Sequence, residues 1–145
     1  MPKIDISRLP VDTATNYPDP FWKQIVGRER KRLGNAAGLT QFGVNLTTLK
    51  PGAWSSQRHW HENEDEFIYV LAGEIVLCED EGETVLKPGD CFGFGLKSSE
   101  VRRIGIRPRG DDLQSHFAVQ VFIAGQVNDS HPAATQRPAT EDRLF

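Results

Sequence analysis

Short apolar stretches separated by turn residues run through most of the chain, and almost none has the spacing of a helix. In residues 42–47, Phe42, Val44 and Leu46 lie on one face by the two-residue period of a strand. Turns are predicted at Pro51-Gly52 and at Pro88-Gly89-Asp90. Many short strands at close spacing predict an all-β sandwich or barrel, with room for one small ligand. The further strands that we expect cover 54–61, 65–72, 75–78, 84–87, 91–95, 101–107 and 117–124.

The same pattern divides the chain into three parts. Residues 1–37 form an N-terminal arm with the first strand or strands, residues 38–124 the barrel, and residues 125–145 a polar C-terminal tail. Residues 21–26 fit either one helical turn or a short strand. The mixed-sign cluster at 28–32 is interpreted as a solvated strand or turn, and residues 34–38 as a hairpin loop.

Composition narrows the functional classes. The chain has 145 residues and a net charge of −3, with no unbroken basic run, so we expect no nucleic-acid partner. No stretch resembles a signal peptide or approaches a membrane span, so we expect no membrane association and a cytoplasmic location. The two cysteines, Cys78 and Cys91, are interpreted as buried free thiols because both lie among apolar residues.

The candidate chemistry lies in the predicted strands 54–61 and 65–72. His59 and His61 are two residues apart, so on a strand both imidazoles face the same side, and Glu66 opens the next strand. Two nitrogens and one carboxylate on one side of an ion leave positions open for water or substrate, an arrangement that suits Fe(II), Mn(II), Ni(II) or Zn(II). Gln57 shares the parity of the histidines and is expected to line the pocket. The alternative interpretation is that the two histidines and Glu66 are polar residues at the surface and bind no metal.

The spacing Gly-x6-His-x-His-x4-Glu-x6-Gly, from Gly52 to Gly73, is similar to the first cupin motif, and Pro88-Gly89-Asp90 resembles the turn that opens the second. The resemblance covers residues 38–124. It implies a double-stranded β-helix (jelly-roll) barrel, usually dimeric, with a metal or ligand pocket at its centre. Cupins include dioxygenases, isomerases, lyases and non-enzymatic binding proteins, so the fold does not fix the function.

The chain departs from the family pattern in the second motif, where a third histidine is normally found. Depending on the spacing, Arg102 or Glu100 stands at that position, and Arg102 shares its face with Ile104 and Ile106. A guanidinium has no lone pair for a metal, but it matches a carboxylate or phosphate. Arg102 could therefore pair with Glu66 or hold an anionic ligand, unless a register shift leaves it in solvent. Glu100 could instead replace the missing ligand.

Two functions from different classes remain open at this point. The first is a metal-dependent enzyme of dioxygenase, isomerase or lyase type that acts on a small, anionic molecule. The alternative is a non-catalytic small-molecule-binding or regulatory cupin with a degenerate metal site. Catalytic residues are not identified by the sequence. The row Phe67, Tyr69 and Leu71 predicts an apolar outer face and hence a homodimer.

Overall fold

The structure is a computed structural model that describes residues 3–59, 65–94, 105–109 and 119–126. Strands dominate it, and the helical elements are two 3-10 helices and one helical turn. In chain order the elements are η1 (Ile6–Arg8), η2 (Phe21–Ile25), β1 (Arg28–Arg32), α1 (Leu33–Ala36), β2 (Phe42–Leu49), β3 (Glu66–Ala72), β4 (Ile75–Glu79), β5 (Gly82–Leu86), β6 (Cys91–Phe94), β7 (Gly105–Pro108) and β8 (Val119–Gln126).

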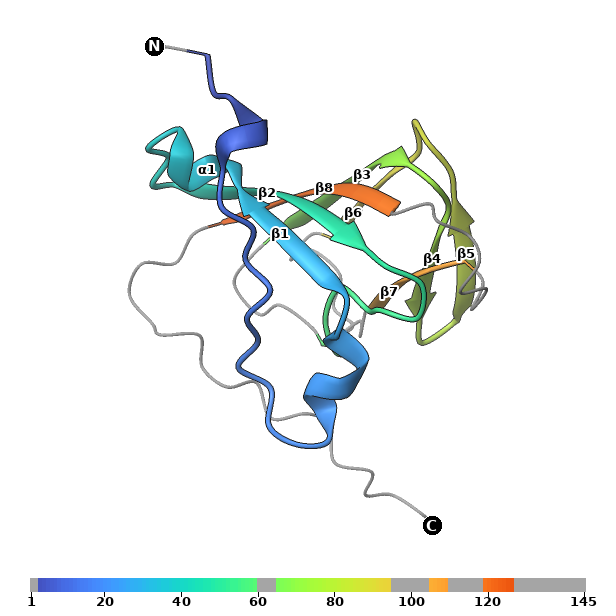
Figure 1. Cartoon of the computed structure of the whole chain (residues 1–145). Helices are drawn as coiled ribbons and strands as arrows, with labels where there is room; N and C mark the ends of the chain where they lie inside the picture. The colour runs from blue at the N-terminus through green and yellow to red at the C-terminus, as the bar shows by residue number, and fades with distance from the viewer. Residues whose placement is uncertain (1–2, 60–64, 95–104, 110–118, 127–145) are drawn as a thin grey trace.

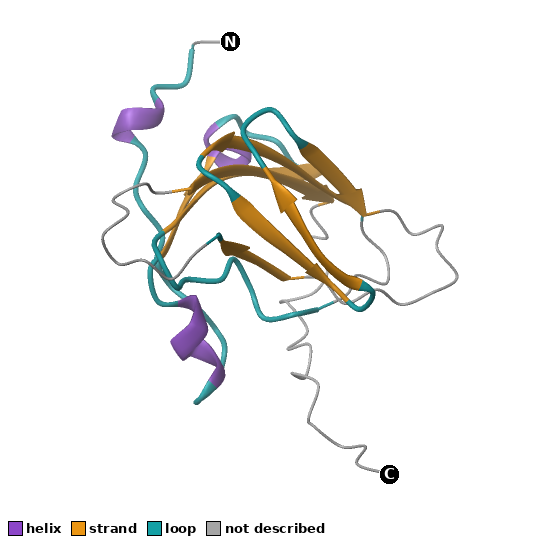
Figure 2. Ribbon diagram, turned by 90° about the vertical axis from the view of Figure 1, so that its right-hand side faces the viewer, coloured by secondary structure: helices purple, strands orange, loops and turns teal. Residues whose placement is uncertain are grey.

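The strands form two antiparallel sheets. One sheet has the order β1-β2-β8-β3-β6 and the other the order β5-β4-β7. Strands distant in sequence are neighbours in both, since β8 lies between β2 and β3, and β7 pairs with β4 (Figure 1). This architecture is a jelly-roll β-barrel, and it confirms the all-β fold class (Figure 2).

The core lies between the two sheets. Its buried side chains come from β2, β3, β4, β5 and β7, and burying each removes enough apolar surface to contribute about 1.5–3 kcal/mol. On β3, Ile68 and Val70 are fully buried, whereas Phe67 is 46% exposed, so the two-residue alternation predicted for this strand is confirmed. The core consists of Leu49, Ile68, Val70, Ile75, Leu77, Leu86 and Ile106.

The segment expected to be a strand at 54–61 differs from the prediction in its described part. Residues 55–58 form bends, and His59 makes only a single bridge. Two neighbouring backbone N–H groups are bound to different elements: Trp54 donates to the Gln24 carbonyl at 2.7 Å and Ser55 to the Ile106 carbonyl at 2.9 Å. Because one partner belongs to η2 and the other to β7, the two hydrogen bonds do not continue as a ladder with a single neighbouring strand.

The N-terminal region also differs from the prediction. Residues 28–32 form strand β1, but Arg28 is only 6% exposed, so interpreting the cluster as solvated was wrong. Its guanidinium is buried because backbone carbonyls accept its hydrogen bonds. The hairpin loop expected at 34–38 is confirmed, since these residues lie in the connection between the antiparallel strands β1 and β2, and the connection contains the helical turn α1 and the turn at Gly38.

The two cysteines differ in their exposure. Cys78 is buried and Cys91 is exposed, so the buried-thiol interpretation is wrong for Cys91, which opens the short strand β6. Within the described ranges, no helix is long and apolar enough to cross a bilayer.

Candidate metal and ligand site

Glu66 begins strand β3 on the face of the sheet that points into the barrel. It shares its parity with Ile68 and Val70, both fully buried, and is itself half-buried. The register pairs Glu66 with Gly125 of β8, and Gly125 in turn with Gly43 of β2. Directly paired residues share a face, so two successive strands beside Glu66 present positions without a side chain. Glycine in a strand often marks a place where a ligand or another backbone comes close.

His59 ends the described part of the loop that precedes β3, and its ring is oriented by the residues just before it. The ring nitrogen Nδ1 lies 2.9 Å from the backbone carbonyl oxygen of Gln57 and 3.2 Å from Oγ of Ser56. A carbonyl oxygen only accepts, so Nδ1 carries the proton in this hydrogen bond. In a neutral ring with its proton on Nδ1, the lone pair lies on Nε2. This tautomer can bind a metal ion through Nε2. The half-buried His59 therefore fits a role as metal ligand.

Gln57 contributes to this arrangement through its backbone and its side chain. Its carbonyl accepts from His59, while its side-chain Nε2 donates to the Phe21 carbonyl of η2 at 2.6 Å. Sequence reasoning placed Gln57 in the pocket by strand parity, and that parity does not apply in a loop. A role in binding a ligand stays a prediction.

Three of the predicted site residues, His61, Arg102 and Glu100, lie outside the described residues. Strand β7 begins at Gly105, and the inward position predicted for Ile106 is confirmed, since Ile106 belongs to the core. Within the described residues, no three His, Cys, Asp or Glu side chains are grouped closely enough to hold a metal ion. Because His61 is not among them, the predicted set of three ligands is not tested.

A row of arginines on the inner face of β1 was missed by sequence reasoning. The register pairs Arg28 with Leu49 and Arg30 with Thr47, and both partners are buried. The arginines at 28, 30 and 32 therefore share the face that carries the core. The signal in the sequence that could have revealed this row was the two-residue period of the arginines. The same period also fits a strand exposed to solvent, so it did not distinguish the two cases.

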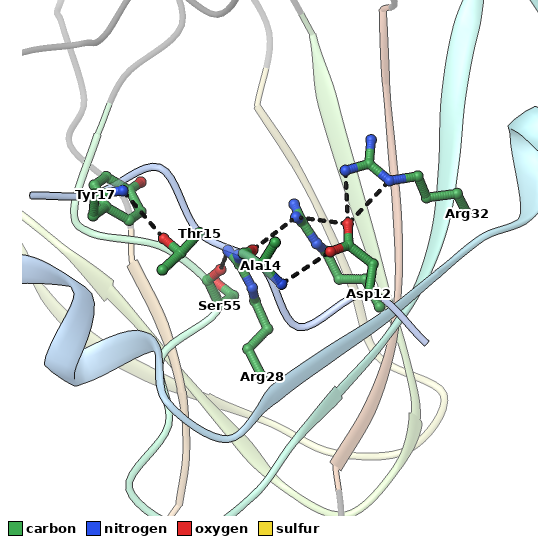
Figure 3. A network of polar contacts seen from close by, with 8 residues as sticks. Asp12, Ala14, Thr15, Tyr17, Arg28, Arg32 and Ser55 are labelled. Atoms are coloured by element: carbon green, nitrogen blue, oxygen red, sulfur yellow. Dashed lines mark hydrogen bonds and ion pairs between the residues drawn. The ribbon is translucent and has the colours of Figure 1, made fainter. Parts of the chain in front are cut away.

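One carboxylate from the N-terminal arm lies among these arginines (Figure 3). Asp12 accepts from Arg32 at 2.7 Å and from Arg30 at 3.1 Å, and the hydrogen bond from Arg32 is the main reason that the pKa of Asp12 is lowered. Burial, and after it the positive charge of Arg30, lower the pKa of Arg28 to about 10. At neutral pH the cluster therefore holds three cations against one carboxylate.

Comparison with known proteins agrees with this architecture. The family model of the cupin domain matches residues 45–95, while no curated protein matches the chain. A solved structure from Silicibacter pomeroyi, described as a sugar phosphate isomerase from a cupin superfamily, is 36% identical, with a TM-score of 0.78 over 87% of this chain and 76% of that one. A putative sugar phosphate isomerase from Acidithiobacillus ferrooxidans is 30% identical, with a TM-score of 0.62 over 70% of this chain and 60% of that one.

More distant structures share the fold alone. A predicted oxalate decarboxylase from Thermotoga maritima is 20% identical, with a TM-score of 0.60 over 86% of this chain and 97% of that one. A barrel shared at that identity says nothing about the reaction. The fold, the matched domain and the 36% identical structure show that this chain belongs to the cupin superfamily.

Proposed function

We propose that this protein is a metal-dependent cupin enzyme that isomerises a small phosphorylated sugar. His59, His61 and Glu66 would hold a divalent ion, and Arg102 would bind the anionic group of the substrate. Support for the reaction class comes from the two structures above 25% identity, both described as sugar phosphate isomerases. The observation that carries the metal site is the hydrogen bond from His59 Nδ1 to the Gln57 carbonyl, which puts the ring proton on Nδ1 and the lone pair of the neutral ring on Nε2.

The residues of the chain have separate tasks in this proposal. His59 is oriented before binding by the Gln57 carbonyl, so little conformational freedom is lost when an ion binds. Glu66, the first residue of β3, would supply a carboxylate oxygen on the inward face of the sheet, beside the glycine positions 43 and 125. A divalent ion bound there would polarise the carbonyl oxygen of the sugar. Isomerisation itself needs a proton moved between two neighbouring carbons, and no described residue is assigned to that step.

The experiment begins with metal content. Protein purified without a metal-affinity step should contain, or stoichiometrically bind, one of Fe(II), Mn(II), Ni(II) or Zn(II), and His59→Ala should abolish this binding. Loaded protein should then convert an aldose phosphate, such as ribose 5-phosphate or mannose 6-phosphate, into the ketose, followed by proton NMR. Metal binding without conversion of any five- or six-carbon aldose phosphate would refute the isomerase proposal and leave the metal site standing.

The second candidate is a non-catalytic binding cupin, and the absence of a histidine from the second motif favours it. Two unit charges about 5 Å apart repel by roughly 3 kcal/mol at an effective dielectric of about 20, so a fixed positive charge at that distance would weaken the binding of a divalent ion by at least about two powers of ten. Arg102→His should therefore tighten metal binding by at least that factor if Arg102 lies in the pocket. Equal affinity in the two proteins would show that Arg102 lies elsewhere.

A further inference from the structure

The loop that carries His59 is bound to the N-terminal part of the chain by side-chain and backbone hydrogen bonds. We call residues 53–59 the histidine loop and residues 12–25 the N-terminal segment. The Trp54 N–H donates to the Gln24 carbonyl at 2.7 Å, and the Gln57 side chain donates to the Phe21 carbonyl at 2.6 Å. Both acceptors belong to η2, so this short 3-10 helix holds the loop at two points.

Arg28 links the same two segments a second time. Its Nη1 donates to the Ser55 carbonyl at 2.7 Å and its Nη2 to the Ala14 carbonyl at 2.8 Å (Figure 3). One acceptor lies in the histidine loop and the other in the N-terminal segment, so one guanidinium fork joins them. Burying a cation costs less where its donors are bound, so these two carbonyls stabilise the buried guanidinium at Nη1 and Nη2, although Nε is buried without a partner among the described residues.

The histidine loop also contacts strand β7. The Ser55 N–H donates to the Ile106 carbonyl at 2.9 Å, and the side chains of Trp54 and Arg58 pack against Gly105. The loop is thus held between the N-terminal segment and β7. Its last described residue is His59, whose ring is in turn oriented by the Gln57 carbonyl.

We propose that Gln57 is a positioning residue for the metal site, and that the N-terminal segment is part of that site through it. The side chain of Gln57 fixes the loop to Phe21, and its backbone carbonyl fixes the ring of His59 with Nε2 as the ligand atom. The N-terminal segment lies outside residues 45–95, the part of the chain that matches the cupin domain. The effect on metal affinity rests on the proposed function, whereas the effect on the His59 ring does not.

The test replaces the side-chain donor while keeping its length. Gln57→Glu has no amide N–H, and its carboxylate is repelled by the Phe21 carbonyl, so the loop should move away from η2. The tautomer of His59 is read in the metal-free protein by nitrogen-15 NMR at a pH where the ring is neutral, with the signal assigned by its loss in His59→Gln. We expect the Nδ1–H form in the unmodified protein and a mixture in Gln57→Glu. Cobalt(II), titrated alone and followed by its visible spectrum, should bind about 10- to 100-fold more weakly.

Lys31→Met is the matched control. Lys31 also donates from a side chain to a backbone carbonyl of the N-terminal region, that of Ile6 at 2.9 Å, but this contact does not involve the histidine loop. Its loss should change neither the tautomer of His59 nor the cobalt affinity. If Gln57→Glu does not fold, as judged by circular dichroism, Gln57→Met removes the donor without adding a charge and serves in its place.

The outcomes separate the two proposals. An unchanged His59 tautomer together with unchanged cobalt affinity in the folded Gln57 variant would overturn the positioning role. Equal losses in Lys31→Met and the Gln57 variant would overturn it as well, because any weakening of the N-terminal region would then suffice. Unmodified protein that binds no cobalt would refute the proposed metal site, and the tautomer measurement would still decide the role of Gln57.

Discussion

Position 105 of strand β7 has to be glycine because neighbouring side chains occupy the space that a Cβ would need. A Cβ built there would lie 2.6 Å from Cζ3 of Trp54 and 3.0 Å from Cγ of Arg58, closer than atoms approach without displacement. The position is buried, so the Trp54 ring has to move if the glycine is replaced. Trp54 belongs to the histidine loop, and a shift of its ring is transmitted to the segment that carries His59.

We therefore expect Gly105→Ala to lower the free energy of unfolding by about 1–3 kcal/mol, the usual range for forcing extra atoms into a packed interior. Denaturant titration followed by tryptophan fluorescence measures this change. Gly93→Ala is the matched control in strand β6, because the added Cβ would meet only Cδ2 of Phe67 at 3.9 Å. Equal stability of the two variants would contradict the packing role of Gly105.

At the scale of elements, the N-terminal arm is held to the edge strand β1 by both backbone and side chains. Asp12 and Arg30 form an isolated antiparallel bridge, with N–H to carbonyl distances of 2.8 and 2.9 Å. The Asp12 side chain accepts from Arg30 and Arg32, and its Oδ1 accepts from the Ala14 N–H at 2.9 Å. The arm thus covers the outer edge of β1, an edge that would otherwise offer unpaired backbone groups to another chain (Figure 1).

These contacts predict a pH dependence of stability. The hydrogen bond from Arg32 is the largest cause of the lowered pKa of Asp12 in the folded protein, and the bond from the Ala14 N–H follows. A carboxyl whose folded pKa lies below its unfolded value stabilises the fold above the unfolded pKa, near 4, and loses this contribution as the pH falls through the folded pKa. Asp12→Asn should be less stable than the unmodified protein at pH 7, and the difference should shrink toward pH 2 in thermal unfolding.

The control for this measurement is Asp19→Asn. In the described part of the chain, Asp19 forms an ion pair with Lys23 at 3.2 Å, and both side chains are exposed; such surface pairs contribute at most about 1 kcal/mol. Its loss should leave the pH profile close to that of the unmodified protein. A stability difference for Asp12→Asn that stays constant from pH 7 to pH 2 would show that the Asp12 carboxylate is not the source.

At the scale of the whole molecule, the outer face of the five-stranded sheet carries the apolar row predicted from the sequence. Phe67, Tyr69 and Leu71 are 46, 39 and 39% exposed, and two strands away Val44 and Leu46 of β2 share this outer face. We propose that a second copy of the chain covers this face, since an apolar sheet face is self-complementary across a two-fold axis.

Light scattering at tens of micromolar should then give twice the mass of one chain. Replacing Phe67 and Leu71 together by lysine should shift the mass to that of the monomer, because two charges would be buried at the interface. Val85→Lys is the control, since Val85 is similarly exposed at 38% but lies on the other sheet. A monomer mass for the unmodified protein would refute the dimer.

Much of the barrel could be predicted because its signals are local. The alternation in β3, the apolar runs of β4 and β8 and the turn at Pro88-Gly89-Asp90 depend on neighbours a few residues away, and a two-residue period needs no knowledge of the partner strand. The spacing of His59, His61 and Glu66 is equally local, so it identified the candidate ligands and the resemblance to cupins.

Other features were decided only by strands and segments that are distant in sequence. Arg28 is buried because Ser55 and Ala14 bring carbonyls to it, and residues 55–58 form a loop because their neighbours bind to η2 and β7. The glycine positions beside Glu66 are aligned by the register of β2, β8 and β3. Burial of a polar group depends on which acceptors reach it, and register depends on which strands pair; both are properties of the folded chain rather than of any short stretch of its sequence.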